Sequence, residues 1–420
     1  GDFTGTDGVP AWTFAPGRFM TLTHDPPIIP ALKRLLAGAE EDLAGLRDLE
    51  LLRTLTTIEE IRGVEVRVAS RWLVSWCTND YLGFSQHPRI IRAACEAARR
   101  WGVGARASRL LAGSTTLHAQ LEARLAAFFG AESALVFPSG YLANLGTLTA
   151  LLGHEDIVLV DRLAHASLVD AARASRARLR VFRHNDVGQL AGLLERGAGA
   201  RRRVVVTEGL FSMDGDRAPL AQLVDVVNAH EALLYLDDAH GAFVLGSSGR
   251  GSPQQAGVPH AAMIYMGTLG KALGAQGGFV VGPQSLIQFL QNRARHFLYA
   301  TALATPLVAA ALEALRVLDE DPAQRARLAQ RVRQVHATLD FLKDLRPSTP
   351  SHIVPIIVGS AVRACSLSTF LRQRDIWAPA IRPPTVPEGT ARLRLSVSAL
   401  HTEQQVEQLA QTLSEGLGRG

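Results

Sequence analysis

One stretch of the sequence places a lysine among small residues in a way that could serve chemistry. It runs from Met266 to Gly274, contains Lys271, and follows an apolar run at residues 261–265. Small neighbours would let a flat cofactor come close to the lysine amine. A nucleotide phosphate loop would require Ser or Thr directly after the lysine, and Ala272 excludes it. A cofactor-holding lysine and an ordinary lysine at a strand-to-helix turn both fit this stretch.

Two apolar segments end in residues suited to a phosphate and to an aromatic ring. After one of them a helix opens with Ser139, Gly140 and Tyr141, and the free N–H groups at a helix start suit a phosphate. After the next comes His165, whose ring could stack on an aromatic cofactor. Taken alone, each feature also fits an ordinary capped helix or a structural histidine.

Two further apolar segments end in acids, a hydroxyl and a histidine. The first leads into a turn that contains Ser212, and the second leads into Asp237, Asp238 and His240. Such groups are costly at a buried strand end unless they are used. A zinc site is the metal interpretation, but no third and fourth ligand has a suitable spacing.

Together these residues match the needs of pyridoxal phosphate. The aldehyde of this cofactor forms a Schiff base with a lysine, for which Lys271 is the candidate. Its protonated ring nitrogen calls for a carboxylate, and its phosphate calls for backbone N–H groups and hydroxyls. The sequence therefore predicts a pyridoxal-phosphate site.

The elements that must position these residues alternate between short apolar strands and segments of helical length. This alternation predicts an α/β fold with a mostly parallel sheet covered on both faces. In such a sheet, ligands bind beyond the carboxyl ends of the strands, where the candidate residues lie. The predicted strands are 134–137, 157–160, 179–182, 203–207, 233–236, 263–266 and 278–281.

Other patterns flank this region on both sides. Alternation predicts a hairpin from 64–68 and 72–76. After about residue 318, mixed helix and strand patterns predict a smaller α+β domain, which gives domain limits of 1–78, 79–313 and 314–420. The arm before residue 29 is expected to be loosely ordered. The remaining predicted elements are one or two helices within 29–55, helices at 88–101, 118–129, 324–342 and 364–374, strands at 353–358 and 392–397, and a last helix at 406–417.

Composition excludes several classes of protein. With 420 residues, 47% hydrophobic and 20% charged, the sequence is typical of an ordinary soluble globular protein. The net charge of +5 is spread over scattered basic residues, so no nucleic-acid partner is predicted. The three cysteines lack a C-x-x-C spacing, which fits the cytoplasm. No membrane span and no signal peptide is predicted.

Several motifs in this order resemble the α-oxoamine synthases, which are pyridoxal-phosphate enzymes of the fold-type I class. The resemblance runs from about Arg53 to the C-terminus. It implies a large cofactor-binding domain with a seven-stranded sheet, a small C-terminal domain, and a homodimer with shared active sites. The motifs lie at residues 79–83, 161–167, 184–186, 207–220, 237–251, 268–271, 295–299 and 380–395.

The resemblance implies a catalytic set of four residues. Lys271 would hold the cofactor as a Schiff base and then act as the base. Asp237 would pair with the ring nitrogen, and His165 would stack on the ring and assist decarboxylation. His240, together with Ser212, would hydrogen-bond the phenolic oxygen of the cofactor.

The resemblance also implies residues for the phosphate and for the substrates. Asn79 and Arg382 would contact the amino-acid carboxylate or the intermediates, and Arg53 would sit near the acyl substrate. The phosphate would be bound by Ser139, Gly140, Tyr141, Thr268 and Thr301, the last from the partner subunit.

The segment 381–395 resembles the biotin-pathway branch of the family. That branch implies a decarboxylative condensation of L-alanine with a pimeloyl thioester on CoA or a carrier protein. The alternatives are glycine or serine with another acyl-CoA, or a non-catalytic partner subunit on the same fold. Gly270, Ala300 and the loop 104–113 depart from the family pattern, and the loop bears on the choice of acyl chain.

Overall fold

The computed structural model describes residues 29–347 and 349–418. They fall into two compact units, one ending at Thr54 and the other beginning at Leu55. The predicted arm at residues 1–28 lies outside the described residues. The first unit contributes helix α1 (Pro30–Asp48), which opens with a proline, a residue suited to a first helical position. The predicted helix to residue 55 is too long, because Glu50 adopts a left-handed backbone with φ 55°.

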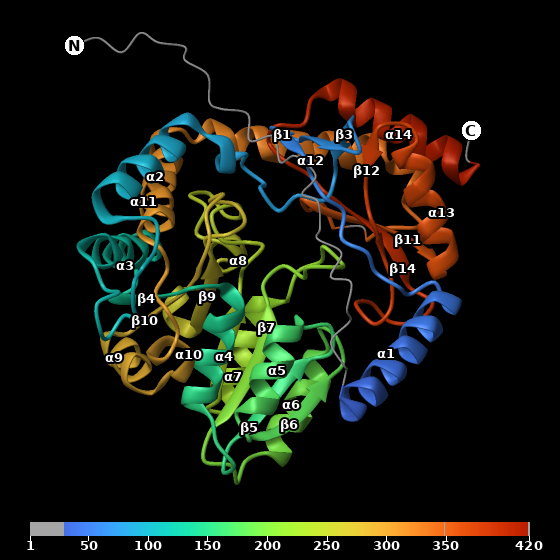
Figure 1. The fold of residues 1–420 in the computed structure, drawn as a ribbon. Helices are drawn as coiled ribbons and strands as arrows, with labels where there is room; N and C mark the ends of the chain where they lie inside the picture. The colour runs from blue at the N-terminus through green and yellow to red at the C-terminus, as the bar shows by residue number, and fades with distance from the viewer. Residues whose placement is uncertain (1–28, 348, 419–420) are drawn as a thin grey trace, which may run out of the picture. The chain divides into compact units, whose positions relative to one another are not determined.

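The second unit is built on a seven-stranded sheet with the order β4-β10-β9-β8-β7-β5-β6 (Figure 1). Every neighbouring pair is parallel except the two that involve β10. The predicted fold class and all seven predicted strands are confirmed. The strands are β4 (Ser133–Phe137), β5 (Ile157–Asp161), β6 (Arg178–Phe182), β7 (Arg203–Glu208), β8 (Leu233–Asp237), β9 (Ile264–Thr268) and β10 (Gly278–Gly282).

Alternation along these strands divides the interior into two cores, one on each face of the sheet. In β7, Val205 belongs to one buried cluster, whereas Val204 and Val206 belong to the other. Successive side chains of a strand point to opposite faces, so strands covered on both sides must be apolar throughout. Helices α4 (Gly140–Leu151), α5 (Ala166–Ala174), α9 (Gln284–Arg293) and α10 (Arg295–Leu298) supply residues to the second cluster.

The first cluster is larger and extends into the C-terminal part of the chain. The contributing helices are α2 (Pro88–Trp101), α3 (Thr116–Phe129), α6 (Val187–Arg196), α7 (Leu220–Ala229), α11 (Thr305–Glu320), α12 (Ala323–Thr338), α13 (Ala361–Arg372) and α14 (Glu403–Leu417). A short helix, α8 (Ser252–Ala256), and three short 3₁₀ turns at 84–86, 260–262 and 340–342 complete the helical elements of the described residues.

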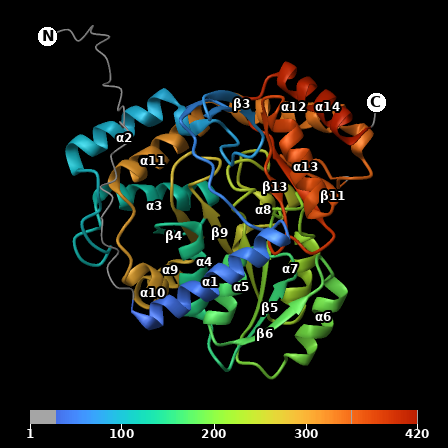
Figure 2. The ribbon, with the colours of Figure 1, turned by 45° about the vertical axis from the view of Figure 1, so that its right-hand side comes forward.

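The C-terminal part has a small sheet of its own and helps to complete a second one (Figure 1 and Figure 2). Its own sheet has the order β11 (Ile353–Gly359), β14 (Ala391–Ser396) and β13 (Ala380–Ile381). The other joins β1 (Glu60–Arg62), β2 (Glu65–Val68), β3 (Arg71–Ser75) and β12 (Ile376–Trp377). The predicted hairpin thus shares a sheet with the C-terminal part, while the predicted domain limits stay predictions.

The start of α4 packs directly on β10 through glycine. A Cβ added to Gly278 would lie 2.6 Å from the Cα and 2.7 Å from the N of Gly140. Backbone atoms cannot move aside as a side chain can. We expect Gly278→Ala to lower the free energy of unfolding by about 1–3 kcal/mol and to displace the start of α4.

Urea unfolding would measure this effect, with Gly282→Ala as the matched control. Gly282 ends the same strand, and its added Cβ would meet only the tip of the Leu286 side chain, at 3.0 Å. Equal unfolding midpoints for the two variants would contradict the close packing of α4 on β10.

Candidate active site

A cavity of about 170 Å³ lies at the carboxyl ends of the parallel strands. The four residues predicted to be catalytic, namely Lys271, His165, Asp237 and His240, all line it. The other lining residues are Gly140, Tyr141, Asn144, Ser167, Glu208, Ala239, Met266 and Thr268. The structure thus brings together residues that follow five different strands, as the position of ligands in parallel sheets leads one to expect.

Lys271 is held in the loop between β9 and β10. Gly274 turns that loop with φ 62°, and an added Cβ there would lie 2.2 Å from the backbone N of Ser85. The Nζ of Lys271 lies 2.7 Å from Nε2 of His240. Burial lowers the pKa of the Lys271 amine to about 8, against the opposing charges of Asp237 and Glu208. A buried amine of this kind can act as a base near neutral pH.

Asn144 fixes the carboxylate of Asp237. The amide of Asn144 donates to Oδ2 of Asp237 at 2.8 Å and to Oγ of Ser167 at 2.8 Å, and it accepts from the hydroxyl of Tyr235 at 2.8 Å. The N–H of Ala239 donates to Oδ1 of Asp237 at 2.9 Å. Both carboxylate oxygens therefore have fixed partners. Sequence reasoning missed Asn144, although a polar residue within an apolar helix was the available signal.

The side chain of the neighbouring acid, Asp238, does not line the cavity and instead bonds to surrounding residues of the fold. It accepts from the N and Oγ of Ser252 at 2.7 and 2.5 Å, and from the hydroxyl of Tyr265 at 2.9 Å. Burial raises the pKa of Asp238 to about 7. Adjacent residues of an extended chain point to opposite sides, so only one of the two acids reaches the cavity.

Glu208 joins the turns that follow β5 and β7. Its side chain is buried, with 2% of the residue exposed, and accepts from the backbone N of His165 at 2.7 Å and of Ser212 at 3.2 Å. Burial and the nearby Asp237 charge raise its pKa well above the usual range. Burial also lowers the pKa of His165, whose Nδ1 lies 2.8 Å from Oγ of Ser167. A neutral His165 ring suits stacking on an aromatic group.

A chain of hydrogen bonds leads from His240 to the C-terminal sheet. Nδ1 of His240 lies 2.6 Å from the hydroxyl of Tyr81, which donates to Oδ1 of Asn79 at 3.1 Å. Arg394 of β14 reaches that Oδ1 and the Tyr81 hydroxyl, each at 3.4 Å. Arg394 also donates to Oγ of Ser396 at 2.8 Å and to the carbonyl of Ser212.

The hydrogen-bond partners of Arg394 that lie in this region are neutral oxygen atoms. Only 7% of the residue is exposed, so its charge is buried without a carboxylate bonded to it here. Sequence reasoning gave no role to Arg394 or to Tyr81. A buried cation next to the cavity is suited to an anionic substrate group.

The predicted phosphate-binding residues are only partly gathered at the cavity. Gly140 and Tyr141 line it at the start of α4, where the first N–H groups of a helix have no partner within the helix. Oγ of Ser139 caps this helix by accepting from the N of Leu142 at 3.2 Å. Thr268 lines the cavity and donates to the carbonyl of Gly277 at 2.8 Å. The donors therefore fit a phosphate.

Six predicted residues do not line the cavity, and two of them, Ser139 and Asn79, are the helix cap and the Tyr81 partner described above. The backbone N of Ser212 donates to Glu208, which lines the cavity, and the carbonyl of Ser212 accepts from Arg394, whereas Arg382 is half-buried. Thr301 is exposed and pairs with Ser108. Arg53 belongs to the unit that ends at Thr54. Their predicted roles stay predictions.

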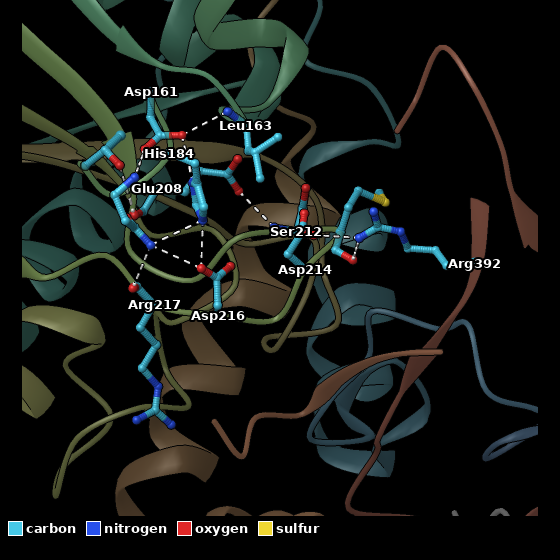
Figure 3. Close-up of polar contacts among 12 residues, drawn as sticks. Asp161, Leu163, His184, Glu208, Ser212, Asp214, Asp216, Arg217 and Arg392 are labelled. Atoms are coloured by element: carbon cyan, nitrogen blue, oxygen red, sulfur yellow. Dashed lines mark hydrogen bonds and ion pairs between the residues drawn. The ribbon is translucent and has the colours of Figure 1, made fainter. Parts of the chain in front are cut away.

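A second network, which sequence reasoning also missed, stands beside the cavity (Figure 3). His184 lies between two acids, with Nδ1 2.9 Å from Oδ1 of Asp161 and Nε2 2.7 Å from Oδ2 of Asp216. Asp161 also accepts from the N of Leu163 at 2.8 Å, in the turn that leads to His165. Burial alone would lower the pKa of His184, but the two carboxylates outweigh it and raise that pKa to about 10.

This network ties the turn after β5 to the turn at residues 208–217. The second turn is also held from the C-terminal sheet, because Arg392 donates to Oδ1 of Asp214 at 2.6 Å and to the carbonyl of Met213 at 3.1 Å (Figure 3). The segments that present His165 and Ser212 are therefore clamped by charge as well as by packing.

Comparisons with known proteins agree with this site. The family model described as aminotransferase class I and II matches residues 72–413. The chain is 48% identical over 370 residues to an 8-amino-7-oxononanoate synthase of Anaeromyxobacter sp. (strain K), covering 88% of this chain and 92% of that relative. It is 45% identical over 378 residues to the synthase of that name from Geobacter sulfurreducens, with 90% and 96% covered.

Solved structures with the same fold include serine palmitoyltransferases. One from S. paucimobilis, which carries a bound PLP–myriocin aldimine, has a TM-score of 0.86 at 29% identity and covers 92% of this chain and 98% of its own. An 8-amino-7-oxononanoate synthase from Francisella tularensis has a TM-score of 0.71 at 28% identity and covers 82% and 98%. The chain belongs to the aminotransferase class I and II family, in the branch of the α-oxoamine synthases. The predicted family and the predicted cofactor, pyridoxal phosphate, are confirmed.

The His184 network predicts a pH-dependent stability. The pKa of His184 is about 10 in the folded chain against about 6.5 in the unfolded chain. A histidine whose pKa is raised by folding stabilises the folded state fully below about pH 6.5, and this stabilisation is lost as the pH rises toward 10. We expect His184→Gln to lower the free energy of unfolding by about 2–3 kcal/mol at pH 6.5, and by much less at pH 9.5.

Urea unfolding of both proteins at the two pH values would test this expectation. The exposed His154, changed to Gln, is the control for the loss of a histidine. A gap between wild type and His184→Gln that stayed constant from pH 6.5 to 9.5 would show that the charge of His184 does not hold the turns together.

Proposed function

We propose that this chain acts as an 8-amino-7-oxononanoate synthase, which condenses L-alanine with a pimeloyl thioester and releases CoA and CO₂. The observation that carries the proposal is the identity of 42–48% to relatives with that name over most of the chain. The serine palmitoyltransferases are structurally similar but only 29–32% identical, which makes the serine-using reaction the second candidate.

The residues around the cavity fit the cofactor. Pyridoxal phosphate, when bound, supplies an electron sink that allows a bond at the amino-acid Cα to be broken and a new C–C bond to form. Lys271 would attach the cofactor and take the α-proton on its Nζ. Asp237, held by Asn144 and Ala239, would keep the ring nitrogen protonated. The start of α4 would bind the phosphate.

Other residues would orient the ring and assist decarboxylation. His165 would stack on the ring, and its depressed pKa supports a neutral imidazole there. His240 and Ser212 would contact the phenolic oxygen. Burial also lowers the pKa of His240 well below its usual range. A neutral His240 can accept one hydrogen bond and donate another, which suits a ring between the Lys271 amine and the Tyr81 hydroxyl.

The buried guanidinium of Arg394 would bind the carboxylate of the amino acid, with Asn79 beside it. Its remaining partners are neutral, so a substrate carboxylate would supply the missing negative charge. Arg382 would assist there, and Arg53 would lie near the acyl chain.

Assembly and location extend the proposal. The active sites would be shared in a homodimer, with Thr301 reaching the phosphate of the partner subunit, and the exposure of Thr301 supports this role. Among the described residues, no helix is both long and apolar enough to cross a membrane. All three cysteines are free thiols, which supports a cytoplasmic location.

Attachment of the cofactor to Lys271 can be tested directly, because the chain has only three lysines: Lys33, Lys271 and Lys343. After borohydride reduction of the loaded wild type, we expect a single added cofactor mass on the peptide that contains Lys271. Lys271→Ala should lose this mass and all condensation activity, a loss of at least about 10³-fold for removal of a catalytic nucleophile and base.

The exposed Lys343, changed to Ala, is the matched control and should keep both properties. Cofactor mass on another lysine in the wild type would sink the assignment of Lys271.

The substrate pair can be identified by measuring CoA release with alanine, glycine or serine against pimeloyl-, acetyl-, succinyl- and palmitoyl-CoA. We expect alanine with pimeloyl-CoA to be turned over fastest. If that pair releases no CoA while another pair does, the chain is a different α-oxoamine synthase. If no pair releases CoA although Lys271 holds the cofactor, the non-catalytic alternative gains support.

A further inference from the structure

A second cavity, of about 500 Å³, shares no lining residue with the catalytic one. It lies between the segment 244–255 of the large sheet region, helix α12, and residues 350–352 before β11. Its size falls in the range of small-molecule sites, roughly 300–1,000 Å³. None of the functional roles described above uses this cavity.

Among the described residues, two arginines and no acidic residue line this cavity. Arg217 donates to the carbonyl of Pro350 at 3.0 Å, and Arg325 donates to the carbonyls of Gly246 and Ser247 at 3.3 and 3.0 Å. Carbonyl oxygens satisfy N–H groups but carry no charge. Burial lowers the pKa of both guanidinium groups, with no carboxylate acting in the opposite direction. Two cations therefore face one cavity without compensation.

Two buried N–H groups beside this cavity lack a hydrogen-bond partner among the described residues. They are Nε of Arg217 and Nε of Arg325. His352 also lines the cavity and is only 2% exposed, and its ring packs on Tyr81 with centroids 4.3 Å apart. Buried polar atoms in proteins are normally paired, so two unpaired ones around one cavity indicate a missing partner.

Arg325 lies in the first turn of α12, and the carboxylate of Asp321 just before this helix accepts from the N of Ala323 at 3.0 Å. The partial positive charge of the helix start is therefore already met by an acid of the chain. The two guanidinium groups are the cations for which the cavity supplies no counter-charge.

We infer that this cavity binds a small anion, a phosphate or carboxylate group carried on an apolar body. The guanidinium groups of Arg217 and Arg325 would hold the anionic group by charge-assisted hydrogen bonds. The apolar body would lie against the remaining wall, which includes Leu245, Leu328 and Val332. The site is distinct from the catalytic cavity and does not depend on the proposed reaction.

The competing structural explanation is that both arginines only clamp neighbouring carbonyl groups together. That explanation accounts for the bonds to Pro350, Gly246 and Ser247. It leaves the two charges and the two unpaired Nε atoms unexplained, whereas an anion accounts for them. The two explanations differ in one measurable property, which is anion binding that depends on the arginines.

Calorimetric titration of the cofactor-loaded protein in phosphate-free buffer would test the inference. The probes are inorganic phosphate, hexyl phosphate and heptanoate. We expect hexyl phosphate to bind more tightly than inorganic phosphate because of the apolar wall. Its order against heptanoate would identify the anionic group as phosphate or carboxylate.

The variants decide where binding occurs. Arg217→Gln and Arg325→Gln should each weaken binding of the better probe by about tenfold, and the double variant should abolish it. Arg325→Lys should retain most of the affinity, and Arg333→Gln, on the exposed face of the same helix, should retain all of it. Binding should be unchanged by saturating L-alanine, which separates this site from the catalytic cavity.

Absence of binding in the wild type would overturn the inference. So would equal affinities in the wild type and the double variant, because the arginines would then be structural clamps only. If the double variant does not fold, the single variants and Arg325→Lys give the same comparison.

Discussion

The structure of this protein depends on charged groups that are buried at the carboxyl ends of parallel strands. Glu208 and Asp237 stand opposite one another on β7 and β8. Two carboxylates and an amine in one cavity are tolerated only because other groups fix them. Backbone N–H groups donate to Glu208, and the amide of Asn144 donates to Asp237. The charges of these two carboxylates act on the buried amine of Lys271. Burying these charged groups lowers the stability of the fold, and the packing of the apolar strands beneath them offsets that loss.

Around that centre, the large sheet region and the C-terminal part perform different tasks. The strands of the large sheet supply the residues that fit the cofactor. The C-terminal strand β14 supplies Arg394, which reaches Asn79 and Tyr81 from the other end of the chain. The His184 network fixes two turns of the large sheet region to each other by charge, and Arg392 of β14 holds one of these turns from the C-terminal part.

The sequence allowed the sheet and much of the site to be predicted because buried parallel strands are continuous apolar runs. Lys271, Asp237, His165 and His240 follow such runs and could be placed by that rule. Strands β12 and β13 have two residues each, too few to show a pattern. Asn144 lies within a helix, and Arg394 is 315 positions from Asn79. No local pattern joins residues that far apart, so their contacts emerge only from the folded chain.

Two arginines on one face of β14 limit which segments can be exchanged between relatives. Arg392 and Arg394 are two positions apart, so both side chains point the same way, and both contact the turn at residues 208–217. A chimera that took its C-terminal part from one relative and its central sheet from another would separate these arginines from the turn that they evolved with. The smallest segment that can be exchanged between relatives without breaking these contacts is therefore a pair: strand β14 together with that turn.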